Sequence, residues 1–141
     1  MSNKRQVNST KTTVDGIKFA SKLEAYMYTL LIENGFEPGY EAETFILMED
    51  FAYEYDSYEY YRTREMKNSK GKKIQGIKYT PDFVGDGFII EVKGRANERF
   101  PLRWKMFKQY IAKNRPGTNL YMPKNQKDCQ QVIELLKKSR E

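Results

Sequence analysis

The sequence predicts an α/β (α+β) domain in which a mixed β-sheet is flanked by helices. Apolar residues recur at helical spacing in three separate segments, and the stretches between these segments are rich in β-branched and aromatic residues, which favour strands. The resulting order along the chain is helix, strands, helix, strand, helix. The chain has 141 residues, which is enough for one such domain with a buried core.

Each expected element has its own start or stop signal. Residues 1–15 are polar and are expected to form a flexible tail, so that a single domain covers residues 16–141. A first helix should begin at Ser21 and end at Gly35, because glycine often terminates helices. The other expected elements are a helix over residues 102–113, a strand over residues 119–122 and a helix over residues 128–138. The residues that the helices should turn toward the core are Leu23, Met27, Leu30, Leu31, Trp104, Phe107, Tyr110, Ile111, Cys129, Val132, Ile133 and Leu136.

Charge is distributed unevenly between the first two helices. Residues 41–61 contain seven acids and no Lys or Arg, whereas residues 62–78 contain seven bases and one acid. Opposite charges that face each other help two strands to pair, so we expect a charged β-ribbon inserted at about residues 50–76, with residues 67–76 as its hairpin loop. The acidic half is interpreted equally well as a solvated surface without chemistry. The basic loop is suited to phosphate contacts through Lys70, Lys72 and Lys73.

The composition excludes several classes of active site. The chain contains no histidine and one cysteine, Cys129, which rules out zinc sites of the Cys/His type, Ser-His-Asp triads and internal disulfides. Hydrolytic chemistry would have to use carboxylates, lysines or tyrosines, and oxygen ligands favour Mg²⁺, with Mn²⁺ able to substitute. The net charge of +6 fits a polyanionic partner, either nucleic acid or an acidic membrane surface. No segment has the length of a membrane span or the pattern of a signal peptide, so we expect a cytoplasmic protein with no membrane partner.

The most informative segment covers residues 80–94. Its Asp86-Gly87 pair is a strong signal for a two-residue hairpin turn of type I′. A turn at this pair makes Asp82 face Glu91 across two strands, and Lys93, two residues further along, falls on the same face. A three-residue loop would instead move Glu91 to the other face unless a bulge corrected it.

Two opposed carboxylates in an apolar sheet repel each other and are costly to desolvate, and a divalent cation between them removes both problems. We therefore expect Asp82 and Glu91 to bind the metal, with the backbone carbonyl of Val92 as a further ligand. Water activated there could attack a phosphodiester, and Lys93 would orient this water, help to deprotonate it or neutralise the transition state. The alternative is that the Pro-Asp pair only opens a turn and that the Glu-x-Lys strand is only a solvated edge.

This pattern resembles the motif of the restriction-endonuclease-like superfamily, which is Pro-Asp, a spacer, then Asp or Glu, any residue, and Lys. It is most similar to the phage endonuclease I group of Holliday-junction resolvases and related short phage nucleases, in which a helix carrying Ser-x-Leu-Glu precedes these strands. The resemblance implies a restriction-endonuclease-like mixed sheet flanked by helices and a Mg²⁺-dependent endonuclease that acts on DNA. The matching residues are Ser21-Lys22-Leu23-Glu24, Tyr79-Thr80-Pro81-Asp82-Phe83 and Glu91-Val92-Lys93-Gly94.

The resemblance also implies that Glu24 is a further catalytic carboxylate that reaches the metal from the first helix. Ser21-x-x-Glu24 has a second interpretation as a capping box, in which the glutamate bonds back to the start of the helix. Members of the group often act as dimers, so a homodimer is an expectation, although no dimerising segment can be identified. A phage origin, and with it the host cell's cytoplasm, is implied by the resemblance alone. The insert over residues 50–76 is longer than in a minimal resolvase, so the resemblance supports nuclease activity better than it supports a four-way junction as the substrate.

Basic residues directly after the Glu-x-Lys strand are candidates for DNA contacts. A nuclease must hold the backbone on both sides of the cut, and phosphate contacts position the strand without reading its sequence. A single lysine on a helix face is usually only solvated, whereas the cluster as a whole favours DNA. The candidates are Arg95, Arg99, Arg103, Lys105 and Lys108.

The sequence thus favours a metal-dependent endodeoxyribonuclease, in its structure-selective form acting on branched DNA in phage recombination, replication or packaging. Two alternatives from other classes stay open. One is a catalytically silent nucleic-acid-binding module of the same fold, which would bind no metal. The other is a phage structural or interaction protein whose charged ribbon mediates contacts, and it would show neither metal-dependent cleavage nor salt-sensitive DNA affinity.

Overall fold

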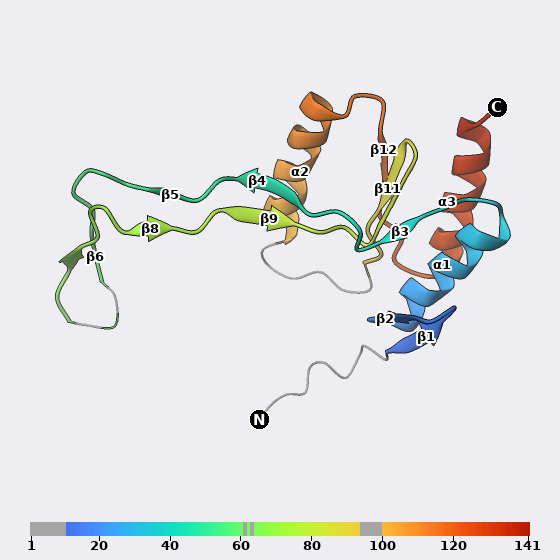
Figure 1. Ribbon diagram of the computed structural model, residues 1–141, viewed down its shortest axis with the longest axis horizontal. Coiled ribbons are helices and arrows are strands. Elements are labelled where there is room, and N and C mark those ends of the chain that lie inside the picture. The colour runs from blue at the N-terminus through green and yellow to red at the C-terminus, as the bar shows by residue number, and fades with distance from the viewer. Residues whose placement is uncertain (1–10, 61, 63, 94–99) are drawn as a thin grey trace.

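The computed structural model describes residues 11–60, 62, 64–93 and 100–141, and this part of the chain is a mixed α+β structure with three helices and several small sheets (Figure 1). The predicted mixture of helices and strands is confirmed. The helices are α1 (Lys22–Glu33), α2 (Phe100–Asn114) and α3 (Gln126–Ser139). The strands are β1 (Thr12–Val14), β2 (Ile17–Phe19), β3 (Gly39–Tyr40), β4 (Phe45–Met48), β5 (Phe51–Ala52), β6 (Tyr58–Glu59), β7 (Lys67–Asn68), β8 (Lys73–Ile74), β9 (Ile77–Tyr79), β10 (Phe83–Gly85), β11 (Phe88–Ile90) and β12 (Asn119–Tyr121).

The largest sheet has four strands in the order β12-β11-β10-β3. It is mixed, because β11 runs parallel to β12 while β10 runs antiparallel to both of its neighbours. Figure 1 shows α1 and α3 on one side of this sheet and α2 on the other. Successive strand residues point to opposite faces, so Phe88 and Ile90 pack in the core with α1 and α3, whereas Ile89 packs in the core with α2.

Helix α1 begins and ends where the sequence predicts. The side chain of Ser21 caps its start by accepting a hydrogen bond from the backbone N–H of Glu24 at 3.1 Å. At its other end Gly35 has a φ of 83°, and the N–H of Phe36 donates to the carbonyl of Leu31 at 2.9 Å. This six-to-one bond is the Schellman ending, which needs a left-handed residue and therefore favours glycine at that position.

The apolar faces predicted for α2 and α3 also point into the core. Phe107 and Ile111 of α2 are buried, and the predicted face of α3 is buried at every position. Cys129 is fully buried in α3, and this burial raises the pKa of its thiol to about 12, so the thiol stays protonated at neutral pH. None of the described helices is both long and apolar enough to cross a membrane.

The predicted flexible tail is wrong over its last residues. β1 and β2 form an antiparallel hairpin around Asp15 and Gly16, whose φ angles of 52° and 78° suit a type I′ turn. The ring of Phe19 in β2 is fully buried against Tyr28, which ties this hairpin to the core. The described domain therefore starts before residue 16. Residues 1–10 lie outside the described part of the chain.

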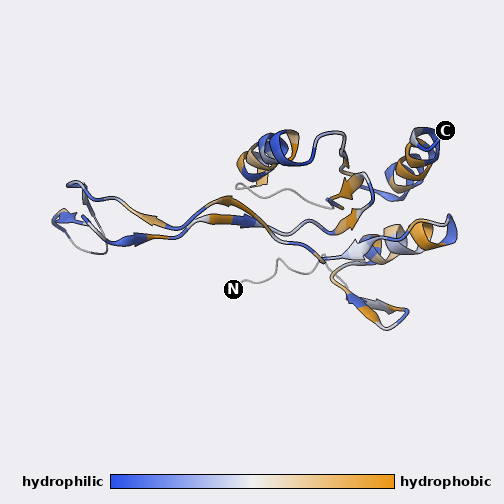
Figure 2. Cartoon of the chain, turned by 45° about the horizontal axis from the view of Figure 1, so that its top comes forward, coloured by the Kyte–Doolittle hydropathy of each residue, from blue (hydrophilic) through white to orange (hydrophobic). Residues whose placement is uncertain are grey.

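The charged stretch forms a long two-stranded arm, which we call the ribbon arm and which comprises residues 45–79. β4 pairs with β9, β5 with β8 and β6 with β7, all antiparallel, and Figure 1 shows the arm projecting away from the helices. Figure 2 shows hydrophobic residues along β4 and β9, next to the body, and a more hydrophilic tip. Opposite charges face each other as predicted, because Glu59 pairs with Lys67 and Asp50 forms an ion pair with Lys73.

Two details of this region differ from the prediction. Residues 67–76 are not the hairpin loop but the returning strand of the arm, since β7 and β8 lie within them. This stretch contains two glycines, which are common in loops, but both have a place in the strand pair. Gly71 has a φ of 77° in a turn within the returning strand, and a Cβ on Gly76 would lie 2.0 Å from the carbonyl oxygen of Met48. The strand expected to carry Asp82 is also shorter than predicted, because β10 begins at Phe83 and the preceding strand β9 ends at Tyr79.

Candidate active site at the Asp82–Glu91 pair

The hairpin of β10 and β11 has the predicted register. Phe83 pairs with Ile90, Val84 with Ile89 and Gly85 with Phe88, which leaves two residues in the turn. The turn type differs from the prediction, because among these two residues only Gly87 has a positive φ, of 81°. A positive φ at the second central position alone is typical of a type II turn. The register, and not the turn type, decides which side chains face each other.

The strand that carries Glu91 is fixed on its far side by β12. The backbone N–H of Glu91 donates to the carbonyl of Tyr121 at 2.9 Å, and the N–H of Lys93 donates to the carbonyl of Pro123 at 2.8 Å. These bonds continue the parallel ladder beyond β11 and hold residues 91–93 extended. Glu91 and Lys93 therefore share a face with Ile89, which is the face covered by α2.

Asp82 is a buried acid with 8% of its surface exposed. Its Oδ2 accepts a hydrogen bond from the backbone N–H of Val92 at 2.8 Å, which holds the carboxylate across the strand pair. Burial raises the pKa of Asp82 strongly, and the nearby charges of Glu91 and Glu24 raise it further. A carboxyl group in this state gains most from a cation, because a cation offsets both the loss of water and the repulsion.

Glu91 lies in the same environment, with more partners. Its Oε1 accepts a hydrogen bond from the hydroxyl of Tyr79 at 2.6 Å, and the backbone of Asp82 also bonds to this carboxylate. Burial raises the pKa of Glu91, while these bonds and the charge of Lys93 act in the opposite direction. The ammonium nitrogen of Lys93 lies 3.9 Å from the ring centroid of Phe100 at the start of α2. Two acids and one lysine thus meet on one face, as predicted.

Glu24 approaches this pair from the start of α1. Its charge acts on both Asp82 and Glu91, so the structure brings the three acids into one electrostatic neighbourhood. Its Oε1 accepts a hydrogen bond from the hydroxyl of Tyr40 at 2.5 Å. Only half of a capping box is present, since Ser21 caps the backbone N–H of Glu24 while the Glu24 carboxylate binds Tyr40. Tyr40 sits on β3, paired with Phe83, and this places Glu24 beside the hairpin.

The chemistry of these donors fits a hydrated divalent cation. Among the described residues, no group of three or more acidic, histidine or cysteine side chains is arranged to hold a metal ion. Mg²⁺ does not need such a group, because it is commonly held by one or two carboxylates and keeps several water molecules. Asp82 and Glu91 would supply the two carboxylates. The Val92 carbonyl faces the same way as the Val92 N–H that binds Asp82, because both groups of a strand residue point to one neighbour.

The predicted DNA-binding residues do not lie together in one place. Arg103 lies near Tyr79, and its Nε is buried without a hydrogen-bond partner in the described part of the chain. Lys105 and Lys108 are exposed on α2, whereas Lys70, Lys72 and Lys73 are exposed on the ribbon arm, away from the acidic pair. Of these, Lys73 is already paired with Asp50 at 3.2 Å. Arg95 and Arg99 lie outside the described residues.

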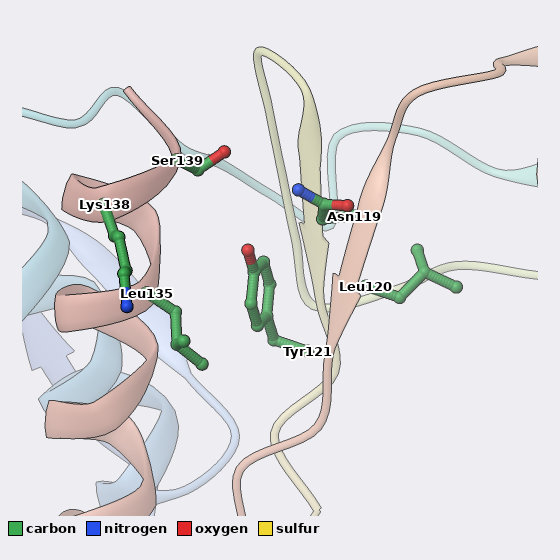
Figure 3. A pocket seen from close by; sticks show the side chains of 6 residues that line it. All are labelled: Asn119, Leu120, Tyr121, Leu135, Lys138 and Ser139. Atoms are coloured by element: carbon green, nitrogen blue, oxygen red, sulfur yellow. The ribbon is translucent and has the colours of Figure 1, made fainter. Parts of the chain in front are cut away.

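Two cavities of about 400 Å³ border the sheet. One lies between Lys93, the start of α2 and the end of β12, and its wall contains Phe100, Trp104 and Met122. The other lies between β12 and α3, where the side chains of Tyr121 and Leu135 project into the space between strand and helix (Figure 3). The first cavity shares Lys93 with the acidic pair, while the second lies on the other face of the sheet. Of these two cavities, only the first borders the candidate active site.

Two participants in the site are not apparent from the sequence. The sequence places Tyr79 in a strand without a further role, yet it holds Glu91, and it gives Tyr40 no role, yet this residue holds Glu24. Tyr79 belongs to the matched motif Tyr79-Thr80-Pro81-Asp82-Phe83, but neither this motif nor the sequence around Tyr40 predicts a contact with these acids, because β9 and β3 come close to them only through the fold. The aromatic wall of the first cavity is predicted by the sequence simply as part of the core.

Comparisons with known proteins give the family and no activity. A search of the curated proteins finds no match to the chain, and a search of the solved structures finds none either. A family model described as "Protein of unknown function (DUF1064)" matches residues 4–126. Because this match covers most of the chain and includes the whole Asp82–Glu91 site, the protein belongs to the DUF1064 family.

Proposed function

We propose that this protein is a divalent-metal-dependent endonuclease that hydrolyses phosphodiester bonds in DNA. The observation that carries the proposal is the buried pair of opposed acids, Asp82 and Glu91, with Lys93 on the same face. Two mutually repelling carboxyl groups at the edge of a core destabilise a protein that has no use for them. Their presence is accounted for if they bind Mg²⁺ or Mn²⁺.

Each residue of the site has a task in such a reaction. Asp82 and Glu91 would hold the cation, with the Val92 carbonyl beside them, and the hydroxyl of Tyr79 keeps Glu91 in position. The bound cation would supply a Lewis acid for the phosphodiester and for the attacking water. Lys93 would stabilise the negative charge that develops on the phosphate. Glu24, which is held by Tyr40, would act on the site through its charge and through water.

Arg103 supports a phosphate ligand at this place. Its buried Nε has no hydrogen-bond partner among the described residues, and a buried donor without a partner is energetically costly. A phosphate oxygen of bound DNA would satisfy it with a charge-assisted bond. Lys105 and Lys108 on the exposed face of α2 would extend this phosphate contact along the strand.

The resemblance to the restriction-endonuclease-like superfamily, and to junction resolvases within it, supports the same function. The Pro-Asp and Glu-x-Lys motifs meet at facing strand ends in a mixed sheet flanked by helices, which is what the proposal requires. We extend the proposal to a branched DNA substrate and to a homodimer on the basis of that resemblance.

Cleavage of a labelled four-way junction beside a linear duplex, with Mg²⁺, Mn²⁺ or EDTA, tests the proposal. We expect metal-dependent cutting that disappears in Asp82→Asn and falls about 100-fold or more in Lys93→Ala. Asp86→Asn, an exposed acid in the turn of the same hairpin, is the matched control and should cut normally. The absence of cutting of either substrate by the wild-type protein, with either metal, would refute the nuclease and favour a silent binding module.

A second pair of variants separates the two interpretations of Glu24. Glu24→Gln removes the charge but leaves the backbone N–H that Ser21 caps, whereas Ser21→Ala removes the cap and leaves the carboxylate. If Glu24 serves the reaction, Glu24→Gln lowers the cleavage rate at unchanged stability. Ser21→Ala should instead lower the free energy of unfolding by about 1 kcal/mol and leave the cleavage rate unchanged.

A further inference from the structure

The cavity beside Lys93 combines an aromatic wall with several positively charged side chains. Phe100 and Trp104 stack on each other with their ring centroids 5.6 Å apart, and Pro101 and Met122 complete the apolar lining. Among the described residues, the charged residues that line the cavity are all lysines, namely Lys93, Lys105, Lys108 and Lys124. Its volume of about 400 Å³ lies in the range of sites that hold small organic ligands.

This combination matches the chemistry of a nucleotide outside a double helix. A nucleobase has a flat apolar face that stacks on aromatic side chains, and it carries a phosphate that lysines attract. A base within a duplex is already stacked between its neighbours and cannot reach such a wall. An acidic peptide would match the lysines, but the aromatic wall would give it no comparable stacking partner.

The cavity is also connected to the acidic pair. Lys93 belongs to both, since it lines the cavity and lies on the same face as Glu91. The ring of Tyr79, whose hydroxyl binds Glu91, lies 6.3 Å from the ring of Trp104, measured between centroids. A nucleotide bound in the cavity would therefore have its neighbouring phosphate next to Asp82 and Glu91.

We propose that this cavity binds one unpaired nucleotide of the DNA substrate, with its base against Trp104 and its phosphates on Lys105, Lys108 and Lys124. The inference rests on the proposed nuclease function and narrows it to DNA with unpaired bases near the cut, such as branch points, flaps or single strands. It gives Trp104 and the lysines a positioning role that does not require a sequence preference.

Trp104 is the chain's single tryptophan, so its fluorescence reports directly on this cavity. The intact protein, kept in EDTA to prevent cutting, is titrated with oligothymidylate, with an abasic oligomer of equal length and phosphate number, and with a blunt duplex. We expect oligothymidylate to quench the fluorescence and to bind between about 5-fold and 100-fold more tightly than the abasic oligomer. Equal binding of the two oligomers, or unchanged fluorescence with both, would overturn the proposal.

Variants of residues in and outside the cavity show which side chains bind the oligonucleotide. Lys105→Ala with Lys108→Ala should weaken the binding of oligothymidylate, whereas Lys113→Ala on the same helix but outside the cavity should not. Binding of a dye-labelled oligomer should survive in Trp104→Phe, which keeps an aromatic ring, and be lost in Trp104→Leu. The wild-type titration decides the matter if the leucine variant does not fold.

The test separates this inference from the nuclease proposal, because the titrations need no metal. If oligothymidylate quenches the fluorescence but no metal-dependent cutting occurs, the nucleotide site is supported and the nuclease proposal is refuted. If metal-dependent cutting occurs but the two oligomers bind equally, the nuclease proposal is supported and the nucleotide site is refuted.

Discussion

The hairpin of β10 and β11 and the ribbon arm are both antiparallel strand pairs, yet they place acids in opposite environments. In the hairpin, Asp82 is buried beside Glu91, and burial raises its pKa. In the arm, Asp50 is exposed, and its bonds to the backbone of Gly76 and to Lys73 lower its pKa. The arm uses its charges to pair two solvated strands, whereas the charges of the hairpin oppose folding. This difference is the reason that we propose the hairpin, and not the more charged arm, as the reaction site.

The largest contrast concerns aromatic residues in the two regions. Phe83 of β10 is fully buried, whereas the side chain of Tyr55 in the arm is 74% exposed. Phe83→Ala should lower the free energy of unfolding by about 3–5 kcal/mol, because it leaves a cavity in the core. Tyr55→Ala should change it by less than about 0.5 kcal/mol. Urea denaturation of both variants measures this, and similar losses would show that the arm packs against something in solution.

The second contrast is the response to pH. The pKa of Asp82 is raised to about 8, so the folded state holds a proton that the unfolded chain releases near its ordinary pKa of about 4. The stability that this proton contributes is thus fully present below about pH 4 and is lost as the pH rises toward 8. Denaturation of the metal-free protein at pH 5 and pH 8 should show a loss of at least about 1.4 kcal/mol, the equivalent of one pKa unit.

Matched variants assign this pH response to one region. Asp82→Asn should flatten most of it, whereas Asp50→Asn in the arm should leave it in place. The raised pKa of Glu91 adds a contribution of the same sign, and Tyr79 and Cys129 titrate only at higher pH. If Asp82 and Glu91 bind Mg²⁺ as we propose, added Mg²⁺ should restore stability at pH 8, because the cation favours the charged form of both acids. A flat response in the wild-type protein would mean that Asp82 is better solvated than the structure indicates.

The third contrast is between the affinity for DNA, which we expect to depend on the arm, and the cleavage rate, which we expect to depend on the hairpin. Replacement of residues 51–74 by Asn-Gly keeps the pairing of β4 with β9 and removes six basic residues, among them the candidate phosphate-binding residues Lys70 and Lys72. If Lys70 and Lys72 bind phosphates as the sequence predicts, and if the protein is the nuclease that we propose, the affinity for DNA should fall about tenfold at moderate salt, while the cleavage rate at saturating DNA stays the same. Lys70→Ala with Lys72→Ala in the full-length arm is the matched control. A slower rate at saturation would place part of the reaction centre in the arm.

The smallest effect is expected for the ion pair within the arm. Lys73 and Asp50 lie 3.2 Å apart, and their side chains are 72% and 46% exposed. Lys73→Ala should therefore lower the free energy of unfolding by less than about 0.5 kcal/mol. A loss above about 1 kcal/mol in urea denaturation would show that the arm holds its charges more tightly than an ordinary solvated strand pair.

Local patterns were sufficient to predict the helices and the register of the central hairpin. The spacing of apolar residues indicated the buried faces of α1, α2 and α3, and the Asp86-Gly87 pair located the turn that sets Asp82 opposite Glu91. The same dipeptide at Asp15-Gly16 also forms a turn, but the first hairpin was not predicted because of the polar residues around this dipeptide.

The remaining errors come from contacts that are distant in the sequence. Gly76 suggested a loop, yet its actual constraint is the backbone of Met48, far back along the chain, which leaves no space for a Cβ. Tyr79 reaches Glu91 because the chain changes direction between β9 and β10, and no spacing rule gives that direction. The partner of Glu24 could not be chosen from the sequence either, since Tyr40 arrives on another strand.

The burial of Cys129 makes the protein convenient for site-specific labelling. Its thiol is fully covered and stays protonated at neutral pH, so maleimide reagents should leave the native chain unmodified. A cysteine introduced at an exposed position of the ribbon arm, such as Tyr55→Cys, would then be the one reactive thiol. An acceptor dye on that thiol, excited by energy transfer from Trp104, would report whether the arm moves relative to the body when DNA, the proposed substrate, is added.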